Sequence, residues 1–148
     1  MKTFERRTRM EYSQLRLNPP EGLKIEESDS ISDFVIELQC PNDTLYANET
    51  FHLKFKLTSN YPIESHEVTF IREIPVNEHV YSNGHICLSI LYQNWSPALT
   101  IASVSLSILS MLSSTRQKKR PLDDESYCKT HVNVSPKNTK WGYDDDSV

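Results

Sequence analysis

The sequence has no long hydrophobic run and no pair of cysteines at redox or zinc spacing. Its apolar stretches stay well below the roughly 18 residues that a membrane-spanning helix needs, so we expect no membrane segment. The charged residues at the start are not followed by an apolar core, so we expect no signal peptide. The three cysteines, Cys40, Cys87 and Cys128, form no C-x-x-C motif. This spacing predicts reduced thiols in a cytoplasmic or nuclear protein.

The sequence also lacks a strong excess of charge. Its formal net charge of −4 gives no general reason to expect nucleic-acid binding. Basic residues gather only locally, at Arg6, Arg7 and Arg9 and again within residues 116–120, and most runs of this kind are solvated faces. None of the five histidines stands at a ligand spacing from a cysteine or carboxylate, so we predict no metal site.

The chain is long enough for one domain with its own core. A chain of 148 residues buries roughly 68–70% of the surface that its unfolded form exposes. Residues 3–17 predict a helix with Phe4, Tyr12 and Leu15 on one side. The helix should end before Pro19, because proline restricts the residue before it and cannot continue a helix.

Alternating hydrophobic and polar residues follow this helix. The alternation is clearest in residues 51–57 and recurs in residues 34–40, and shorter candidates are residues 23–25 and 68–71. Because only short turns separate these segments, they favour a four-stranded antiparallel meander.

Residues 99–114 fit two patterns. Their centre alternates like a strand, yet their hydrophobic residues also repeat at helical spacing. Length favours a helix, since strands usually run about 3–10 residues, although so many serines are unusual in a buried helix. A smaller helix is expected around residues 127–131, and the polar residues 136–148 should form a mobile tail. Trp141 and Tyr143 complicate that expectation, because aromatic side chains usually find a docking place.

The segment from His79 to Ala98 surrounds one cysteine with a glycine-containing turn, a short apolar run and Trp95-Ser96-Pro97. By itself, a cysteine between isoleucine and leucine is usually a small buried hydrophobe. The segment resembles the active-site region of ubiquitin-conjugating enzymes, where Y-x-x-G-x-I-C-L-x-I-L-x-x-x-W-S-P-A surrounds the cysteine that carries ubiquitin. The matching residues are Tyr81, Gly84, Ile86, Cys87, Leu88, Ile90, Leu91, Trp95, Ser96, Pro97 and Ala98.

This resemblance implies an α+β ubiquitin-conjugating fold. It would contain an N-terminal helix, the four-stranded meander, a central helix and a smaller C-terminal helical part, with residues 1–135 as the catalytic domain. It also implies a reaction. An activating enzyme, which uses the ATP, hands ubiquitin to Cys87 as a thioester, and a protein amine then displaces the thiol. No bound cofactor is expected.

The chain departs from the family at the group that stabilises the oxyanion. Relatives usually carry a His-Pro-Asn triplet whose Asn stands eight residues before the cysteine, whereas this chain has Asn77-Glu78-His79. The W-type branch of the family also has His at the third position. His79 could donate one N–H to an oxyanion or hold the loop in shape. The alternative is a loop residue with only a backbone role.

A second departure concerns the attacking amine. Many relatives have an Asp two residues after the cysteine that helps to prepare a lysine, whereas this chain has Ser89, again like the W type. Ser89 is therefore a candidate for a catalytic role. A free lysine titrates near pKa 10.4 and an α-amino group near 7.7–8.0, so their neutral fractions at pH 7 differ by roughly a few hundredfold. W-type enzymes attach ubiquitin to flexible protein N-termini. We therefore hypothesise that this chain prefers N-terminal α-amines.

The W type is further indicated by the strings ICLSIL and MLSS and by the N-T-K-W ending at Trp141. Asp123 and Asp124 lie where relatives often place an acidic residue beside the active site, so both are candidates for a catalytic role, with turn formation as the alternative.

Partner surfaces follow from the same resemblance. RING or U-box ligases would contact Ile63, Ser96, Pro97 and Ala98, and the activating enzyme would contact Arg6, Arg7 and Arg9. Because Ile63 replaces a common Phe, we expect a different ligase choice.

Two rival functions come from other classes. One is a non-catalytic ubiquitin-binding scaffold of the same fold, against which Cys87 counts, because such proteins normally lack the cysteine. The other is a Cys–His hydrolase using Cys87 with His79 or His85, which would also need a third polar group to activate the histidine.

Overall fold

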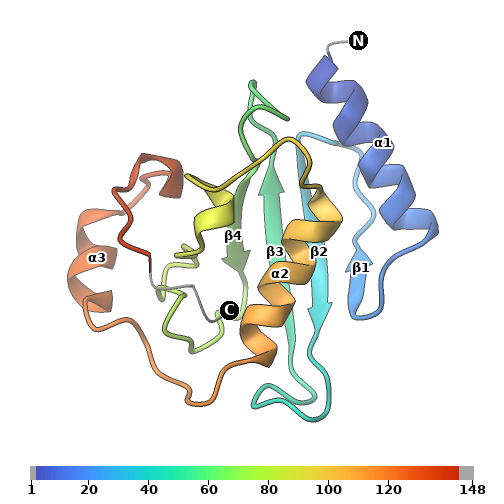
Figure 1. Ribbon diagram of the computed structural model, residues 1–148. Coiled ribbons are helices and arrows are strands. Elements are labelled where there is room, and N and C mark those ends of the chain that lie inside the picture. Colours follow the sequence, from blue (N-terminus) through green and yellow to red (C-terminus); the bar gives the residue numbers. More distant parts are fainter. Residues whose placement is uncertain (1–2, 144–148) are drawn as a thin grey trace.

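The computed structural model describes residues 3–143, and Figure 1 shows how its elements are arranged. The helices are α1 (Thr3–Leu17), α2 (Ile101–Ser113) and α3 (Asp124–Thr130), with short 3-10 turns η1 (Ser89–Leu91) and η2 (Pro136–Asn138). The strands are β1 (Leu23–Ile25), β2 (Asp33–Gln39), β3 (Thr50–Lys56) and β4 (Glu67–Ile71). They form one antiparallel sheet in the order β1-β2-β3-β4, so the predicted α+β fold with a four-stranded meander is confirmed.

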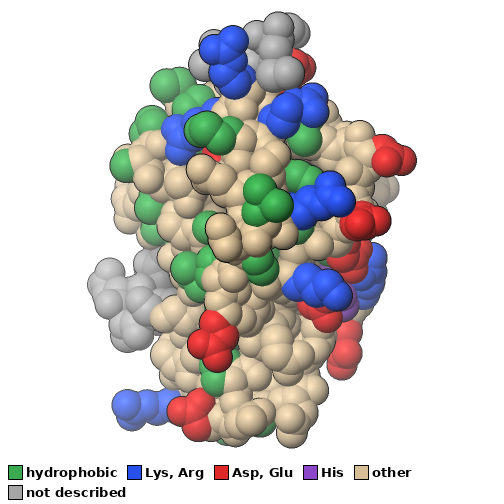
Figure 2. Space-filling model, turned by 90° about the vertical axis from the view of Figure 1, so that its right-hand side faces the viewer, with side chains coloured by type: hydrophobic (Ala, Val, Ile, Leu, Met, Phe, Trp, Pro, Cys, Tyr) green, Lys and Arg blue, Asp and Glu red, His purple; other side chains and the backbone are tan. Residues whose placement is uncertain are grey.

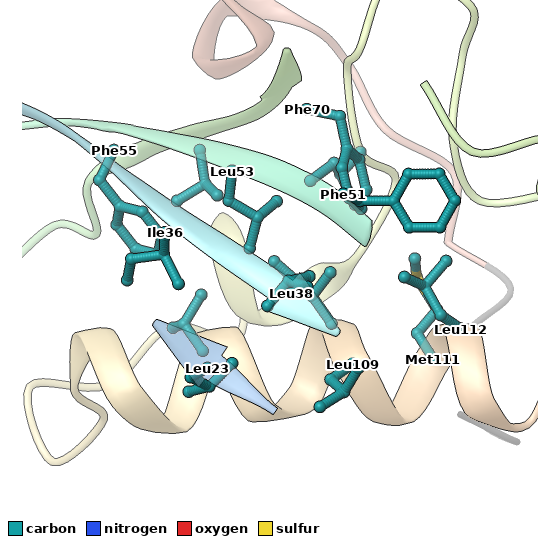
Figure 3. Close-up of a cluster of buried hydrophobic side chains, with 14 of the residues drawn as sticks. Leu23, Ile36, Leu38, Phe51, Leu53, Phe55, Phe70, Leu109, Met111 and Leu112 are labelled. Carbon is teal, nitrogen blue, oxygen red and sulfur yellow. The ribbon is translucent and has the colours of Figure 1, made fainter. Parts of the chain in front are cut away.

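The sheet holds its register because β2 and β3 place their hydrophobic residues on the same face. Ile36 pairs with Leu53 and Leu38 with Phe51, and all of these side chains are buried. Figure 3 shows them beside α2, where Leu109 and its neighbours complete the core. Burying one such side chain is worth about 1.5–3 kcal/mol. A slip of one residue would turn the whole set to the other face.

The serine-rich segment is a helix, α2, as its length indicated. Thr100 begins it with a capping box: its hydroxyl accepts a hydrogen bond from the Ser103 backbone N–H, and the Ser103 hydroxyl accepts one from the Thr100 N–H. Within the helix, the hydroxyls of Ser105 and Ser113 each donate to the carbonyl four residues earlier, both at 2.8 Å. These bonds explain why a buried helix tolerates so many serines.

Helix α1 lies at one edge of the sheet, next to β1 (Figure 1). Tyr12 and Leu15 are buried as predicted, and the Tyr12 hydroxyl donates to the Glu26 carbonyl at 3.2 Å. The side chain of Phe4, the third predicted member of this face, lies outside the part that the structure describes. The helix ends at Leu17, shortly before the two prolines.

The C-terminal part follows α3 across the same side of the molecule as the cysteine loop (Figure 1). Helix α3 begins a few residues earlier than the sequence pattern indicated, and residues 136–143 continue as η2 and an extended segment. The mobility expected for residues 136–148 stays a prediction, and residues 144–148 lie outside the described residues. Between residues 3 and 143, no helix combines the length and the apolar character needed to cross a membrane.

Candidate active site

A tight glycine turn anchors the loop that carries Cys87. Gly84 has a φ of +92°, which favours glycine, and its carbonyl accepts a hydrogen bond from the Phe70 N–H at 2.9 Å. A Cβ at this position would lie 2.2 Å from the Phe70 carbonyl oxygen. Only a residue without a side chain therefore lets the loop approach β4 this closely.

The thiol of Cys87 stands at the surface of this anchored loop. The Cys87 N–H donates to the His79 carbonyl at 2.8 Å, and the flanking Ile86 and Leu88 are buried in the core. Cys87 itself is half-buried. Its two neighbours therefore hold the backbone, while Cys87 itself is only partly exposed.

Cys40 differs, because it is buried at the end of β2 and desolvation raises the pKa of its thiol to about 11. It is unsuited to nucleophilic chemistry.

Asn77 fixes the turn that leads to His79, a role that the sequence reasoning missed. Its side chain is fully buried. The Asn77 Oδ1 accepts from the His79 N–H at 2.8 Å, and its Nδ2 donates to Thr115 Oγ1 at 2.7 Å and to the Tyr46 hydroxyl at 3.2 Å. A short amide two residues before a turn is a known signal for this arrangement. Within the altered triplet, Asn77 therefore holds the loop that carries His79.

His79 is nearly buried, at 9% exposure, and borders a polar hollow of about 420 Å³. Glu78, Thr115, Arg116 and Lys119 also line this hollow. The His79 backbone carries the loop through its bonds to Asn77 and Cys87. The predicted role of its ring as an oxyanion donor stays a prediction.

Ser89 is built into the turn after the cysteine. It is buried, its hydroxyl accepts a hydrogen bond from Asn94 Nδ2 at 3.0 Å, and its carbonyl accepts the N–H groups of Tyr92 and Asn94. The residue therefore shapes η1, and its predicted part in catalysis stays a prediction.

The two aspartates join α3 to the cysteine loop. Asp123 Oδ1 accepts from the Tyr81 hydroxyl at 2.9 Å, and Asp124 Oδ1 accepts from the Ser82 N–H at 2.8 Å. Burial, together with the bond to Asp123, raises the pKa of Tyr81. Both carboxylates thus have a structural task beside the active site, and a catalytic task stays a prediction.

An aromatic cluster that the sequence did not reveal lies between the loop and α3. Tyr127 stacks on Tyr81 with ring centroids 3.8 Å apart, and its hydroxyl lies 2.7 Å from His85 Nδ1. Burial lowers the pKa of His85, which favours the neutral ring. His85 is therefore held by Tyr127, an arrangement that gives little support to a Cys87–His85 hydrolase pair.

The aromatic residues of the C-terminal segment dock at this site. Trp141 stacks on Tyr92 with centroids 5.2 Å apart, and Tyr143 stacks on the same ring at 6.4 Å. Between them, the carbonyl oxygen of Gly142 lies 3.6 Å from Cys87 Sγ. The sequence indicated docking but not its place.

The predicted ligase-contact residues lie on two loops that the structure joins. Trp95 Nε1 donates to the Pro62 carbonyl at 2.8 Å, which connects the loop of Ile63 with the exposed Ser96, Pro97 and Ala98. Ile63 is 77% exposed. These residues are thus accessible on two joined loops, and Ile63 adds an exposed apolar side chain.

The three N-terminal arginines have different surroundings. Arg6 and Arg9 are exposed. Figure 2 shows the side of the molecule on which α1 lies, where basic and acidic side chains are interspersed. Arg7 instead points into the molecule: its Nη2 donates to the Leu99 carbonyl at 2.7 Å and its Nε to Glu11 Oε2 at 3.3 Å. Contact with an activating enzyme stays a prediction for all three.

The Glu11 carboxylate, which accepts the bond from Arg7, is the centre of a hydrogen-bonded group between α1, α2 and the loop of Tyr61. Its Oε2 also accepts from the Tyr61 hydroxyl at 2.5 Å, and its Oε1 accepts from the Ile101 N–H at 2.9 Å, at the start of α2. Burial and the nearby carboxylate raise the pKa of Tyr61. Helical spacing places Glu11 on the same face as Leu15, and a carboxylate on a buried face signals a buried partner.

Among residues 3–143, the structure contains no cluster of three histidine, cysteine or acidic side chains suited to hold an ion.

Comparison with known proteins assigns the family. A sequence model described as ubiquitin-conjugating enzyme matches residues 7–143. The chain is 48% identical to a probable ubiquitin-conjugating enzyme E2 W of Dictyostelium discoideum, covering 98% of this chain and 97% of the relative. It is 47% identical to ubiquitin-conjugating enzyme E2 W of Caenorhabditis elegans, covering 97% and 96%.

The fold agrees with this assignment. The crystal structure of ubiquitin conjugating enzyme E2 UbcA1 from Agrocybe aegerita superimposes with a TM-score of 0.87 at 33% identity, covering 92% of this chain and 99% of that one. A Plasmodium falciparum ubiquitin conjugating enzyme gives 0.71 at 37% identity over 75% and 99%. The chain therefore belongs to the ubiquitin-conjugating enzyme family, as the sequence around Cys87 predicted.

Proposed function

We propose that the chain accepts ubiquitin as a thioester on Cys87 and transfers it preferentially to N-terminal α-amino groups of proteins. The observation that carries this proposal is the presentation of Cys87: a half-buried thiol on a loop fixed by Gly84 and His79, followed by the buried hydroxyl of Ser89 rather than a carboxylate.

The reaction has two acyl-transfer steps. In the first, the Cys87 thiolate attacks the ubiquitin thioester on the activating enzyme, a new C–S bond forms, and the activating enzyme's thiolate leaves. In the second, a neutral amine attacks the carbonyl carbon, the nitrogen loses a proton, and the Cys87 thiolate leaves as the amide forms. The oxyanion of each step needs a donor, and the proposal gives this task to His79.

The preference for α-amines follows from the second step. The amine must be neutral to attack, and at pH 7 an α-amino group is neutral far more often than a lysine. Relatives named E2 W are 48% and 47% identical to this chain over nearly its whole length. Where many relatives have an Asp that prepares the attacking lysine, this chain has the Ser89 hydroxyl, which is bonded to Asn94 and supplies no carboxylate.

Membership of the family implies ubiquitin, an activating enzyme and a ligase as partners. We further propose that RING or U-box ligases bind at Ile63 and residues 96–98, and that the activating enzyme binds at the N-terminal arginines. The proposed substrates are proteins with flexible N-termini, and the proposed location is the cytoplasm or nucleus. The proposal includes no cofactor bound to the chain, since the upstream enzyme uses the ATP.

A charging assay tests the thioester. The chain is mixed with activating enzyme, ubiquitin and ATP and run on a non-reducing gel beside Cys87→Ala and the control Cys128→Ala. The proposal expects a thiol-sensitive adduct with the wild type and the control and none with Cys87→Ala. No adduct with the wild type would favour the ubiquitin-binding scaffold, and ester hydrolysis without activating enzyme and ATP would favour the hydrolase.

A further inference from the structure

The side chain of Lys137 enters the body of the protein from the C-terminal segment. Its side chain is 13% exposed, and its ammonium lies 3.8 Å from Glu64 Oε1. It donates to Ser65 Oγ and, at 2.9 Å, to the Leu91 carbonyl. The Ser65 hydroxyl itself donates to the same carbonyl at 2.6 Å. A largely buried side chain whose cation has this many acceptors is a specific attachment rather than a chance surface contact.

This attachment joins three parts of the chain. Ser65 precedes β4, Leu91 ends η1 just after the cysteine, and Lys137 lies in η2. Two residues before Lys137, the Ser135 hydroxyl donates to Glu67 Oε2 at 2.7 Å and adds a second attachment to β4. The start of the C-terminal segment is therefore fixed to the elements on either side of the active site.

The fixed segment then runs over the thiol. The ring of Tyr92 lies under both Lys137, with Nζ 5.6 Å from its centroid, and Trp141, at 5.2 Å. Trp141 Nε1 folds back to donate to the Pro136 carbonyl at 3.0 Å. One residue later, the Gly142 carbonyl is in contact with Cys87 Sγ at 3.6 Å. The position of Gly142 thus depends on a segment that begins at Lys137.

We propose that residues 135–143 form a strap that shields Cys87, and that Lys137 is the positioning residue that holds the strap closed. An acyl group on Sγ needs space at the side of the thiol that Gly142 occupies, so the strap must lift for charging. Because the segment is held by side-chain contacts and belongs to no strand of the sheet, it can open without unfolding the domain. The inference concerns access to the thiol and does not depend on which amine is used.

The three cysteines allow a direct test without ubiquitin. The full chain is treated with iodoacetamide, and alkylation of each cysteine is followed by mass spectrometry. Lys137→Gln removes the cation, and Lys140→Gln, at an exposed position of the same segment, is the matched control. If the strap shields Cys87, Lys137→Gln should raise the alkylation rate at Cys87 about three- to tenfold, because fewer molecules hold the strap closed. Trp141→Ala should raise it as well.

Cys40 and Cys128 make the result unambiguous. Cys40 is buried in the core and reports unfolding, whereas Cys128 is half-buried on α3 and serves as the reference. A rise at Cys87 alone, absent in Lys140→Gln, supports the strap. Equal Cys87 rates in all variants would overturn it. A parallel rise at Cys40 would also overturn it, since Lys137 would then hold the fold rather than the strap.

Discussion

At the scale of single residues, the unusual Asn77-Glu78-His79 triplet owes its shape to a buried amide. Asn77 bonds with the His79 N–H, Thr115 and Tyr46, so the loop that receives the Cys87 N–H is set by a side chain outside the reaction. Loss of one partner of a buried hydrogen bond costs about 1–3 kcal/mol, because the other partner stays unsatisfied.

Asn77→Asp tests this role. Aspartate keeps the acceptor for the His79 N–H but loses both donors, so we expect the free energy of unfolding to fall by about 1–3 kcal/mol and charging to slow. Denaturant unfolding and the charging assay measure the two effects. Asn83→Asp, at an exposed position of the same loop, is the control. An Asn77→Asp protein as stable as the control would contradict the assignment.

At the scale of elements, the group around Glu11 connects α1 with the start of α2 and with the loop of Tyr61. Arg7 completes it through the Leu99 carbonyl, next to the predicted ligase surface. The sequence showed a run of three arginines in α1, but a linear run does not show that one of them turns inward.

Arg7→Gln and Arg6→Gln separate these two environments. Loss of the charge-assisted bonds of Arg7 should lower the free energy of unfolding by about 1–3 kcal/mol. Arg6 is exposed, so its replacement should change it by less than about 0.5 kcal/mol. Thermal or denaturant melts compare them. Equal effects would show that the Arg7 contacts contribute nothing to stability.

The elements also show where sequence reasoning succeeds. Strands β2 and β3 followed from strict alternation, and α2 followed from its length although serines blurred the pattern. The cysteine motif identified the family from local spacing alone. Contacts between distant segments were not visible: Glu11 with Ile101, Tyr81 with Asp123, and Gly142 with Cys87. Such pairs depend on the folded geometry, which no local pattern encodes.

At the scale of the whole molecule, the core contains a histidine that should make the fold sensitive to acid. His66 is 2% exposed among Phe34, Phe55 and Tyr61, and its Nε2 has no hydrogen-bond partner within the described residues. Burial, helped by the charges of Lys137 and Arg7, lowers its pKa to about 3. The folded protein therefore keeps this ring neutral at pH values where the unfolded chain protonates it.

The sign of the effect follows from proton binding. Below pH 6.5 the unfolded chain takes up a proton that the folded chain refuses down to about pH 3, so stability falls as the pH falls, by about 1.4 kcal/mol per unit for one group. His66→Leu should reduce the loss of stability between pH 7 and pH 5 by about 2 kcal/mol. Urea unfolding at both pH values measures this. An unchanged pH slope in the variant would assign the acid sensitivity to other groups.

The central claim concerns which amine the charged enzyme chooses, and discharge of the Cys87 thioester tests it most directly. Charged enzyme is offered a lysine-free peptide with a free α-amine or the same peptide N-acetylated and carrying one lysine, and loss of thioester is timed. Discharge should be faster onto the α-amine, on the order of tenfold or more, because part of the difference in neutral fraction survives the higher nucleophilicity of lysine. Equal or faster discharge onto lysine would contradict the account.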